Sequence, residues 1–289
     1  MKIYSKFFNP RSLKYFEEKH KDLSITLFWD YIPPDRSYLE ENPYNIFLLH
    51  EPNDFFGIPS WVISNNHAFD LILTWDERVL SRCLNSMKFY CGWIFDWDHF
   101  TPTKKKFEVS FLSGIKEITE GHKLRQEIFS FEDQIRIPKN WNRTLPDFDH
   151  ENNVRPGYTE YAKDTSHIPP TMNPEIYGKQ PLFDSMFHIA IENTIYNNFY
   201  TEKIHQAFLN KTVPIYWGCP NLSEIGYDTR GVIQWTYPNR LVHIINNLTE
   251  EDYFSRMEYI EYNYKIAFLD LLKPKLNHFL EQIKTLNNL

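Results

Sequence analysis

Cysteine is scarce in this sequence, and that scarcity excludes two common ways of stabilising a fold. The 289 residues include only Cys83, Cys91 and Cys219, with no CxxC spacing and no neighbouring pair of histidines. Such a pattern supports neither a disulfide framework nor a structural zinc site. We therefore expect three thiols packed in the interior.

Long basic blocks and long apolar runs are also missing. Lys and Arg number 31 against 38 Asp and Glu, a net charge of −7, and no stretch indicates a nucleic-acid partner or an anionic membrane surface. Residues 1–21 are polar and charged, unlike a signal peptide, and no segment approaches membrane-spanning length. These features predict a cytoplasmic protein with no nucleic-acid partner and no transmembrane segment.

Hydrophobic residues make up 42% of the chain and aromatic residues 17%, enough for a buried core at a length where one core commonly becomes two. Short β-rich runs at 25–29, 46–50 and 69–75 are bounded by polar or proline-containing segments, as in the buried strands of an α/β sheet. A run of three lysines ends this pattern. We place a domain boundary there, giving domains at 1–104 and 105–289.

The second half continues with strands and helices in alternation. The expected elements are strands at 107–112, 187–191, 213–217 and 232–235, and helices at 122–132, 202–209 and within 250–286. Residues 139–180 carry many prolines and no sustained periodicity, which predicts a long loop rather than a core element.

The loop from Glu192 to Lys203 joins a strand to a helix whose N-cap is Thr201. A helix N-terminus offers backbone N–H groups and a partial positive charge, and Lys203 adds a full charge, so this segment could bind a phosphate. In open α/β sheets, ligands bind beyond the carboxyl ends of the strands, where this loop would lie. Alternatively, Glu202 only complements the helix dipole and Lys203 is solvated.

The string FHIAIENTIYNNFYTEKIHQAFLNKTVPIYWGCPN, residues 187–221, resembles the signature of family 10 glycosyltransferases, the α-1,3/1,4-fucosyltransferases. The family shows an E-N pair, a Y-x-T-E-K run and a V/I-P-I-Y-W-G strand at this spacing. Weaker likenesses occur in FEVSFLSG, NIFLLHEPNDF and AFDLILTW. The resemblance covers most of the chain except 139–180 and the extreme C-terminus, and suggests a soluble bacterial or viral member.

Membership would imply the α/β GT-B architecture, two Rossmann-like domains facing a central cleft. The N-terminal domain would bind the acceptor and the C-terminal domain the donor, with C-terminal helices able to pack back on the N-terminal domain. The family inverts the anomeric centre, takes GDP-fucose as co-substrate and transfers to a glycan hydroxyl, so no further cofactor is expected.

Site residues follow from the same resemblance. Asn193, Glu202 and Lys203 would contact the phosphate, ribose or sugar of the donor, and Arg125 would pair with the diphosphate. Glu51, which follows a strand, would be the general base, with His50 as the alternative. Inversion requires a carboxylate that takes the acceptor proton and cations that neutralise the leaving diphosphate.

Position 199 departs from the family pattern. The family usually has Tyr two residues before the Thr of T-E-K, whereas this chain has Phe199 there and Tyr200 next. Both are candidate donor-binding residues. If the missing hydroxyl normally meets the donor, the donor could instead be a UDP-linked pentose or hexose, as in a xylosyltransferase, or another GDP-sugar.

Two further hypotheses concern a metal and a loss of catalysis. Asp96 and Asp98 form a D-x-D pattern that another glycosyltransferase fold uses to hold a divalent cation, but the family likeness aligns them with ordinary acceptor-domain sequence. We therefore expect no metal. A non-catalytic glycan-binding protein is the remaining alternative. The joint presence of Glu51, Arg125 and the Glu202–Lys203 pair argues against it.

Overall fold

The computed structural model describes most of the chain in two compact units. The described residues are 1–5, 10–94, 97, 104–114, 116–143 and 179–287. Unit 1 comprises Met1–Cys91, Tyr196–Phe199 and Leu271–Leu289, and unit 2 comprises Gly92–Ile195 and Tyr200–Asp270. Unit 1 therefore takes in four residues of the loop after residue 195 as well as the C-terminal helix.

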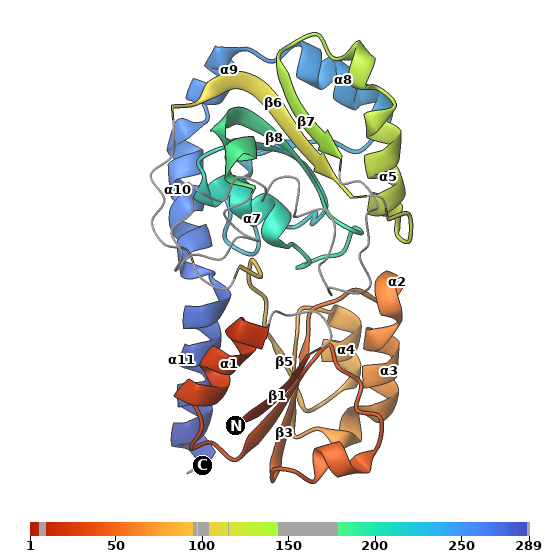
Figure 1. Ribbon diagram of the computed structural model, residues 1–289, viewed down its shortest axis with the longest axis vertical. Helices are drawn as coiled ribbons and strands as arrows, with labels where there is room; N and C mark the ends of the chain where they lie inside the picture. The colour runs from red at the N-terminus through yellow and green to blue at the C-terminus, as the bar shows by residue number, and fades with distance from the viewer. Residues whose placement is uncertain (6–9, 95–96, 98–103, 115, 144–178, 288–289) are drawn as a thin grey trace. The chain divides into compact units, whose positions relative to one another are not determined.

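Unit 1 is built on a parallel five-stranded sheet with strand order β1-β2-β3-β4-β5. Its strands are β1 Lys2–Ser5, β2 Ile25–Trp29, β3 Tyr44–Leu49, β4 Leu71–Thr74 and β5 Ser86–Lys88. Its helices are α1 Pro10–Lys19, η1 Arg36–Leu39, α2 Asn53–Phe56, α3 Ile58–Asn65, η2 Asn66–Ala68, α4 Glu77–Arg82 and α11 Leu272–Asn287. In Figure 1, α1 and α11 lie on one side of this sheet and α3 and α4 on the other.

Packing on both faces explains why the central strands read as continuous apolar runs. All five residues of β2 are buried, and one core cluster joins Phe28 and Phe47 of the sheet to Val62 of α3 and Val79 of α4. A strand covered on both sides needs no polar alternation. The predicted strand at 25–29 has the observed bounds, whereas β1 and β5, at the two edges of the sheet, were not predicted.

Unit 2 also contains a parallel five-stranded sheet, with order β10-β9-β8-β6-β7. Its strands are β6 Lys106–Ser113, β7 Lys139–Arg143, β8 Ser185–Ile191, β9 Val213–Trp217 and β10 Ile233–Gln234. Its helices are α5 Glu120–Phe129, η3 Glu132–Gln134, η5 Gln180–Asp184, α7 Glu202–Leu209, η6 Thr229–Gly231, α8 Pro238–Asn246, α9 Glu250–Phe254 and α10 Met257–Leu269. Helix α5 lies beside α8, and α7 packs against α10 (Figure 1).

The prediction of a long loop at 139–180 is wrong for its first five residues. Lys139–Arg143 forms β7, which pairs in parallel with β6. Trp141 of this strand packs against Phe111 and Phe129, with ring centroids 5.4 and 5.6 Å apart. The strand lies at the edge of the sheet and is mostly polar, so no hydrophobic pattern marks it. Residues 144–178 lie outside the described residues.

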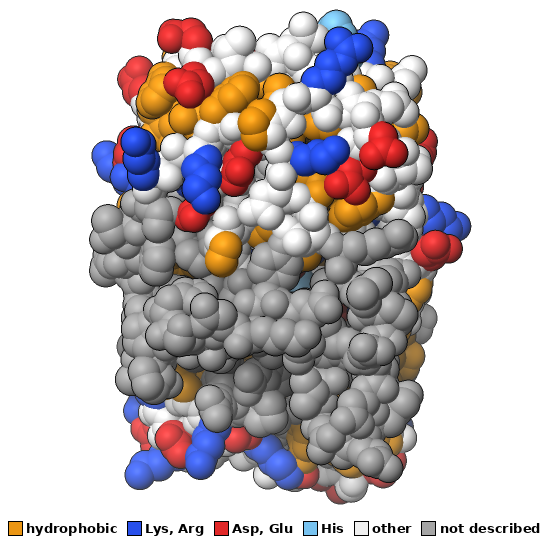
Figure 2. Space-filling model, turned by 45° about the horizontal axis from the view of Figure 1, so that its top comes forward, with side chains coloured by type: hydrophobic (Ala, Val, Ile, Leu, Met, Phe, Trp, Pro, Cys, Tyr) orange, Lys and Arg blue, Asp and Glu red, His pale blue; other side chains and the backbone are white. Residues whose placement is uncertain are grey.

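Cysteines and long apolar segments, both scarce in the sequence, can be located in the structure. All three cysteines are free and buried, as predicted. Among the residues that the structure describes, no helix is both long and apolar enough to cross a membrane. Figure 2 shows acidic and basic side chains mixed over the described part of one face, without a continuous field of one sign.

Candidate functional site

The predicted phosphate-binding loop begins at the carboxyl end of β8 with a fully buried carboxylate, Glu192. Its Oε1 accepts a hydrogen bond from the backbone N–H of Thr201 at 2.9 Å, and its Oε2 accepts one from the Thr201 hydroxyl at 2.6 Å. The Tyr216 hydroxyl donates to Oε1 at 3.4 Å. Burial raises the pKa of Glu192, while the charge of Lys203 and the Thr201 bonds oppose that rise. Glu192 thus fixes the N-cap of α7 from nine residues upstream.

Lys203 lies in the first turn of α7 among carboxylates. Its Nζ is 3.6 Å from Oε2 of Glu192, 3.2 Å from Oε1 of Glu202 and 2.9 Å from the hydroxyl oxygen of Thr201. Burial alone would lower the pKa of Lys203, but the charges of Glu202 and Glu192 raise it above its ordinary value. The side chain remains 24% exposed. Lys203 is therefore a cation held by three oxygen atoms, with a side chain that solvent can reach.

Thr201 is the N-cap of α7, as predicted. It has extended backbone angles, φ −133° and ψ −169°, and its side chain accepts from the backbone N–H of Lys203. This satisfies one donor of the first helical turn. The prediction of the helix itself, Glu202–Leu209, is also confirmed at both ends.

Two glycines allow the backbone to approach Glu192 closely. A Cβ atom on Gly218, which follows β9, would lie 2.4 Å from Cγ of Glu192, and a Cβ on Gly121 of α5 would lie 1.8 Å from its carbonyl oxygen. No side chain fits at either distance. The backbone N–H of Gly121 also donates to the carbonyl oxygen of Asn193 at 2.9 Å. Helix α5 is thereby joined backbone to backbone to the loop after β8.

Arg125, on α5, is directed at the same loop. Its guanidinium donates to the carbonyl oxygens of Ile191 at 2.6 Å and Glu192 at 3.4 Å, and to Oδ1 of Asn193 at 3.0 Å. Only 7% of its surface is exposed. Burial lowers the pKa of Arg125 to about 10, although the nearby carboxylates of Glu192 and Glu202 favour its charged form. It therefore stays protonated at neutral pH and holds Asn193 in place.

His122 contributes no charge to this group. It lies beside the N-cap of α5, where its Nδ1 is 2.6 Å from the hydroxyl oxygen of Thr119. Burial, followed by the charges of Arg125 and Lys203 among others, lowers the pKa of His122 to about 3. At neutral pH the ring is neutral.

Phe199 and Tyr200, the remaining donor-binding candidates, are each 1% exposed. Phe199 packs against Trp75 of unit 1, with ring centroids 4.7 Å apart. The Tyr200 hydroxyl donates to Oδ2 of Asp270 in unit 2. The structure thus gathers Arg125, Asn193, Glu202 and Lys203 around Glu192, and it directs these two aromatic side chains elsewhere.

Glu51, the candidate base, lies in unit 1 just after β3. The buried carboxylate of Asp30 accepts the backbone N–H groups of His50 at 2.8 Å and Glu51 at 3.0 Å through one oxygen, Oδ1. Asp30 has a left-handed backbone, φ 46°, which a non-glycine residue adopts only when its surroundings hold it there. Trp75 donates through Nε1 to the carbonyl oxygen of His50 at 2.7 Å. The backbone at Glu51 is therefore fixed from two neighbouring strands.

Electrostatics also couple Asp30 to its neighbours. Burial, followed by the charge of Glu51, raises the pKa of Asp30 well above its ordinary value. Nδ1 of His50 lies 3.7 Å from Oδ2 of Asp30. His50 is 9% exposed, whereas Glu51 is partly exposed. Of the two candidate bases, Glu51 is the more accessible.

Sequence reasoning missed the residues that position the candidates. Glu192, Gly121, Gly218 and Asp30 were not among the predicted site residues. Glu192 and Asp30 hold neighbouring residues through hydrogen bonds, and Gly121 and Gly218 leave room for the backbone beside Glu192. The only sequence signal for them was the E-N pair and the Gly that follows the V-P-I-Y-W strand. Asp96 and Asp98 lie outside the described residues. No group of three or more His, Cys, Asp or Glu among the described residues is arranged to hold a metal ion.

Comparison with known proteins confirms the resemblance seen in the sequence. Residues 172–270 match the family model described as glycosyltransferase family 10 (fucosyltransferase) C-term. The α-(1,3)-fucosyltransferase FucT of Helicobacter pylori is 32% identical over 88 residues. That match covers 30% of this chain and 16% of the relative, so it spans well under two thirds of the relative's length.

Solved structures show the fold. A crystal structure of an α1,3-fucosyltransferase aligns with a TM-score of 0.50 and 13% identity, covering 91% of this chain and 86% of that one. Anabaena HepE in complex with UDP aligns with a TM-score of 0.53 and 12% identity, covering 97% of this chain and 82% of that one. Sucrose-phosphate synthase from Thermosynechococcus elongatus aligns with a TM-score of 0.54 and 10% identity, covering 94% of this chain and 76% of that one. With its two parallel α/β sheets, this chain has the predicted GT-B fold.

Proposed function

We propose that this protein is a glycosyltransferase that moves fucose from GDP-fucose, with inversion, to a hydroxyl of a glycan acceptor. One observation carries the proposal. At the N-terminus of α7, Lys203 lies 3.6 Å from the buried carboxylate of Glu192. Arg125 donates to the backbone carbonyls of Ile191 and Glu192 and to the side chain of Asn193. All of these residues but Arg125 fall within the segment that matches the family 10 model. This arrangement has the charge and rigidity that a leaving diphosphate requires.

In this proposal, the loop after β8 receives the diphosphate. Before the donor binds, the charges of Lys203 and Arg125 balance those of Glu192 and Glu202. Lys203 is held by Glu202 through a partly exposed contact, so its ammonium can turn from that carboxylate to a phosphate oxygen. Glu202 is then available to accept from a ribose or sugar hydroxyl. Arg125 contributes through its charge and through the Asn193 amide that it orients.

Glu51 is the proposed base. The acceptor oxygen attacks C1 of the donor sugar, the bond from C1 to the diphosphate breaks, and the acceptor proton passes to the Glu51 carboxylate as GDP leaves. Asp30 is a positioning residue, because its side chain binds the backbone of Glu51 and touches no substrate in this scheme. The partial exposure of Glu51, compared with the buried His50, supports this assignment.

The departure at position 199 is compatible with a fucose donor. Phe199 is 1% exposed and packs on Trp75, so its ring is not presented to a ligand and a hydroxyl there would not necessarily meet the donor. The main competing donor is a UDP-sugar, since the similar HepE structure was solved with UDP. A protein that binds glycans without transfer is the competing function of another class.

Thermal denaturation with GDP, UDP, GDP-fucose and UDP-sugars tests the proposal. A ligand that binds only the folded state stabilises it by about 2.7 kcal/mol at 100 times its Kd. We expect GDP and GDP-fucose to stabilise the protein. In a separate transfer assay, NMR should detect a product with inverted anomeric configuration. Stabilisation by UDP species alone would overturn the donor. If no nucleotide stabilises the protein and no sugar is transferred, the enzyme proposal fails.

A further inference from the structure

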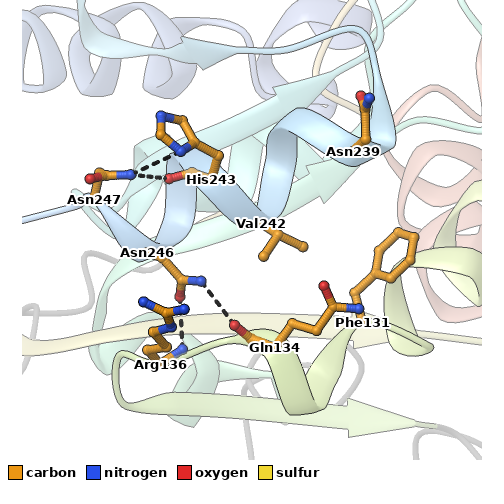
Figure 3. A pocket seen from close by; sticks show the side chains of 8 residues that line it. All are labelled: Phe131, Gln134, Arg136, Asn239, Val242, His243, Asn246 and Asn247. Carbon is orange, nitrogen blue, oxygen red and sulfur yellow. Dashed lines mark hydrogen bonds between the residues drawn. The ribbon is translucent and has the colours of Figure 1, made fainter.

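An open depression of ≈ 430 Å³ lies on unit 2, between α8 and the turn that follows α5. One face of α8 forms its first wall. Asn239, Val242, His243 and Asn246 occupy positions i, i+3, i+4 and i+7 of the helix, the spacing of one helical face. Figure 3 shows the lining residues, with Val242 and Asn246 directed from α8 toward the turn. The volume falls within the range of small-molecule sites, roughly 300–1,000 Å³.

The second wall contains Phe131, Gln134 and Arg136. Asn246 ties the two walls together: its Oδ1 accepts from the backbone N–H of Arg136 at 2.7 Å, and its Nδ2 donates to the backbone carbonyl of Gln134 at 2.8 Å (Figure 3). The depression is therefore preformed, and a ligand would not have to order it.

Its position separates it from the proposed donor site. Glu192 and Lys203 follow the carboxyl end of β8, whereas the turn at Arg136 immediately precedes β7. Because β6, β7 and β8 are parallel, these positions lie at opposite edges of the same sheet. A ligand in the depression would not compete directly with the donor.

The polar groups of the depression suit a neutral ligand rich in hydroxyls. The side-chain amides of Gln134 and Asn239 and the Arg136 guanidinium are exposed, and none bonds to another described residue. No Asp or Glu lines the depression. The lining runs along α8 from Asn239 in its first turn to Asn247 at its C-cap, so the partial charges of the two ends of this helix offset each other. Helix α5 ends beside the depression, and the partial negative charge of its C-terminus disfavours phosphate. Amides donate and accept, as sugar hydroxyls do, and Phe131 supplies an apolar face.

We propose that this depression is a second saccharide site, which binds a short neutral oligosaccharide independently of the nucleotide. The proposal does not depend on the transfer reaction. Its ligand recognition rests on the unengaged amides of Gln134 and Asn239, and its rigidity rests on Asn246.

The test is saturation-transfer NMR and titration with cellobiose, lactose and maltose on the full chain. We expect at least one to bind with Kd up to ~10 mM, and the double variant Gln134→Ala, Asn239→Ala to bind it about tenfold more weakly, the loss expected from two polar contacts. Gln282→Ala, an exposed amide on α11, is the matched control and should bind normally. Neither Gln134 nor Asn239 has a side-chain bond to a described residue, so the double variant should fold normally.

Loss of binding in the double variant distinguishes this site from an acceptor site at Glu51, because Gln134 and Asn239 belong to unit 2 and Glu51 belongs to unit 1. Binding in the depression should be unchanged in Glu51→Gln. The proposal is overturned if no saccharide binds, if the double variant binds as well as the unmodified chain, or if saturating GDP displaces the saccharide. GDP stabilisation of the double variant, measured in parallel, should be unchanged. A failure of GDP to stabilise either chain would count against the transferase proposal and leave the saccharide site intact.

Discussion

Replacing Lys203 by alanine is expected to weaken GDP binding by about 10- to 150-fold. The variant removes an ammonium fixed 3.6 Å from Glu192 and 3.2 Å from Glu202, beside the N-terminus of α7. A hydrogen bond to a charged group contributes about 1.5–3 kcal/mol, and each 1.4 kcal/mol is about tenfold in Kd. The loss should be visible in isothermal titration with GDP.

The same substitution should also reduce stability, in a way that depends on pH. Glu192 is 0% exposed, and the charge of Lys203 opposes the rise in its pKa caused by burial. Without Lys203 the carboxylate is less well compensated, which should cost about 1–2 kcal/mol at neutral pH, since Lys203 is partly exposed. A raised carboxyl pKa destabilises above the unfolded pKa, so the deficit should shrink as pH falls and Glu192 takes up a proton.

Lys211→Ala is the matched control. Lys211 follows the end of α7, is 28% exposed and pairs with Glu261 at 2.6 Å, so it resembles Lys203 in exposure and pairing. Lys211→Ala should bind GDP normally. If a folded Lys203→Ala chain binds GDP within about threefold of the unmodified chain, or if Lys211→Ala weakens binding equally, the phosphate site is misplaced.

Four other perturbations test the site and its surroundings. Gly218→Ala should lower the free energy of unfolding by about 1–3 kcal/mol in urea titrations, because its Cβ would lie 2.4 Å from Cγ of Glu192. His188, whose pKa burial lowers to about 3, stabilises the fold fully above its unfolded pKa of about 6.5 and loses that contribution as pH falls, about 2 kcal/mol by pH 5. Glu51→Gln should lower kcat by about 100-fold or more without weakening GDP binding. Asp30→Ala should lower kcat about tenfold, since both N–H groups at the end of β3 lose their acceptor.

Each of these predictions has a control or an outcome that would contradict it. Ser223→Ala, at an exposed position in unit 2, should leave stability unchanged. His188→Gln should show a smaller loss between pH 8 and pH 5, and an unchanged slope would exclude His188 as the cause. Asp30→Asn keeps an acceptor oxygen and should recover most of the activity that Asp30→Ala loses. Normal turnover by Glu51→Gln would remove Glu51 as the base.

The local sequence pattern was sufficient to predict the bounds of the central strands and of α7. The bounds of β2, α7 and β9 are those expected from the sequence, because strands buried on both faces appear as continuous apolar runs and an amphipathic helix repeats its apolar residues. The N-cap of α7 at Thr201 was likewise readable, since a cap acts on its own first turn. The family resemblance added the candidate residues, whose roles remain predictions.

What the sequence by itself determined, then, was the α/β class of fold, the main strands and the loop that opens onto α7, while the family resemblance added the GT-B architecture. Only the tertiary structure decided which polar residues are buried and what they hold. In the folded chain, Gly218 and Gly121 lie close to Glu192, and the Asp30 side chain accepts a hydrogen bond from the backbone of Glu51. The polar segment Lys139–Arg143 forms an edge strand. The physical reason is that burial and hydrogen-bond partners depend on which strands become neighbours, and that order is not written in local spacing.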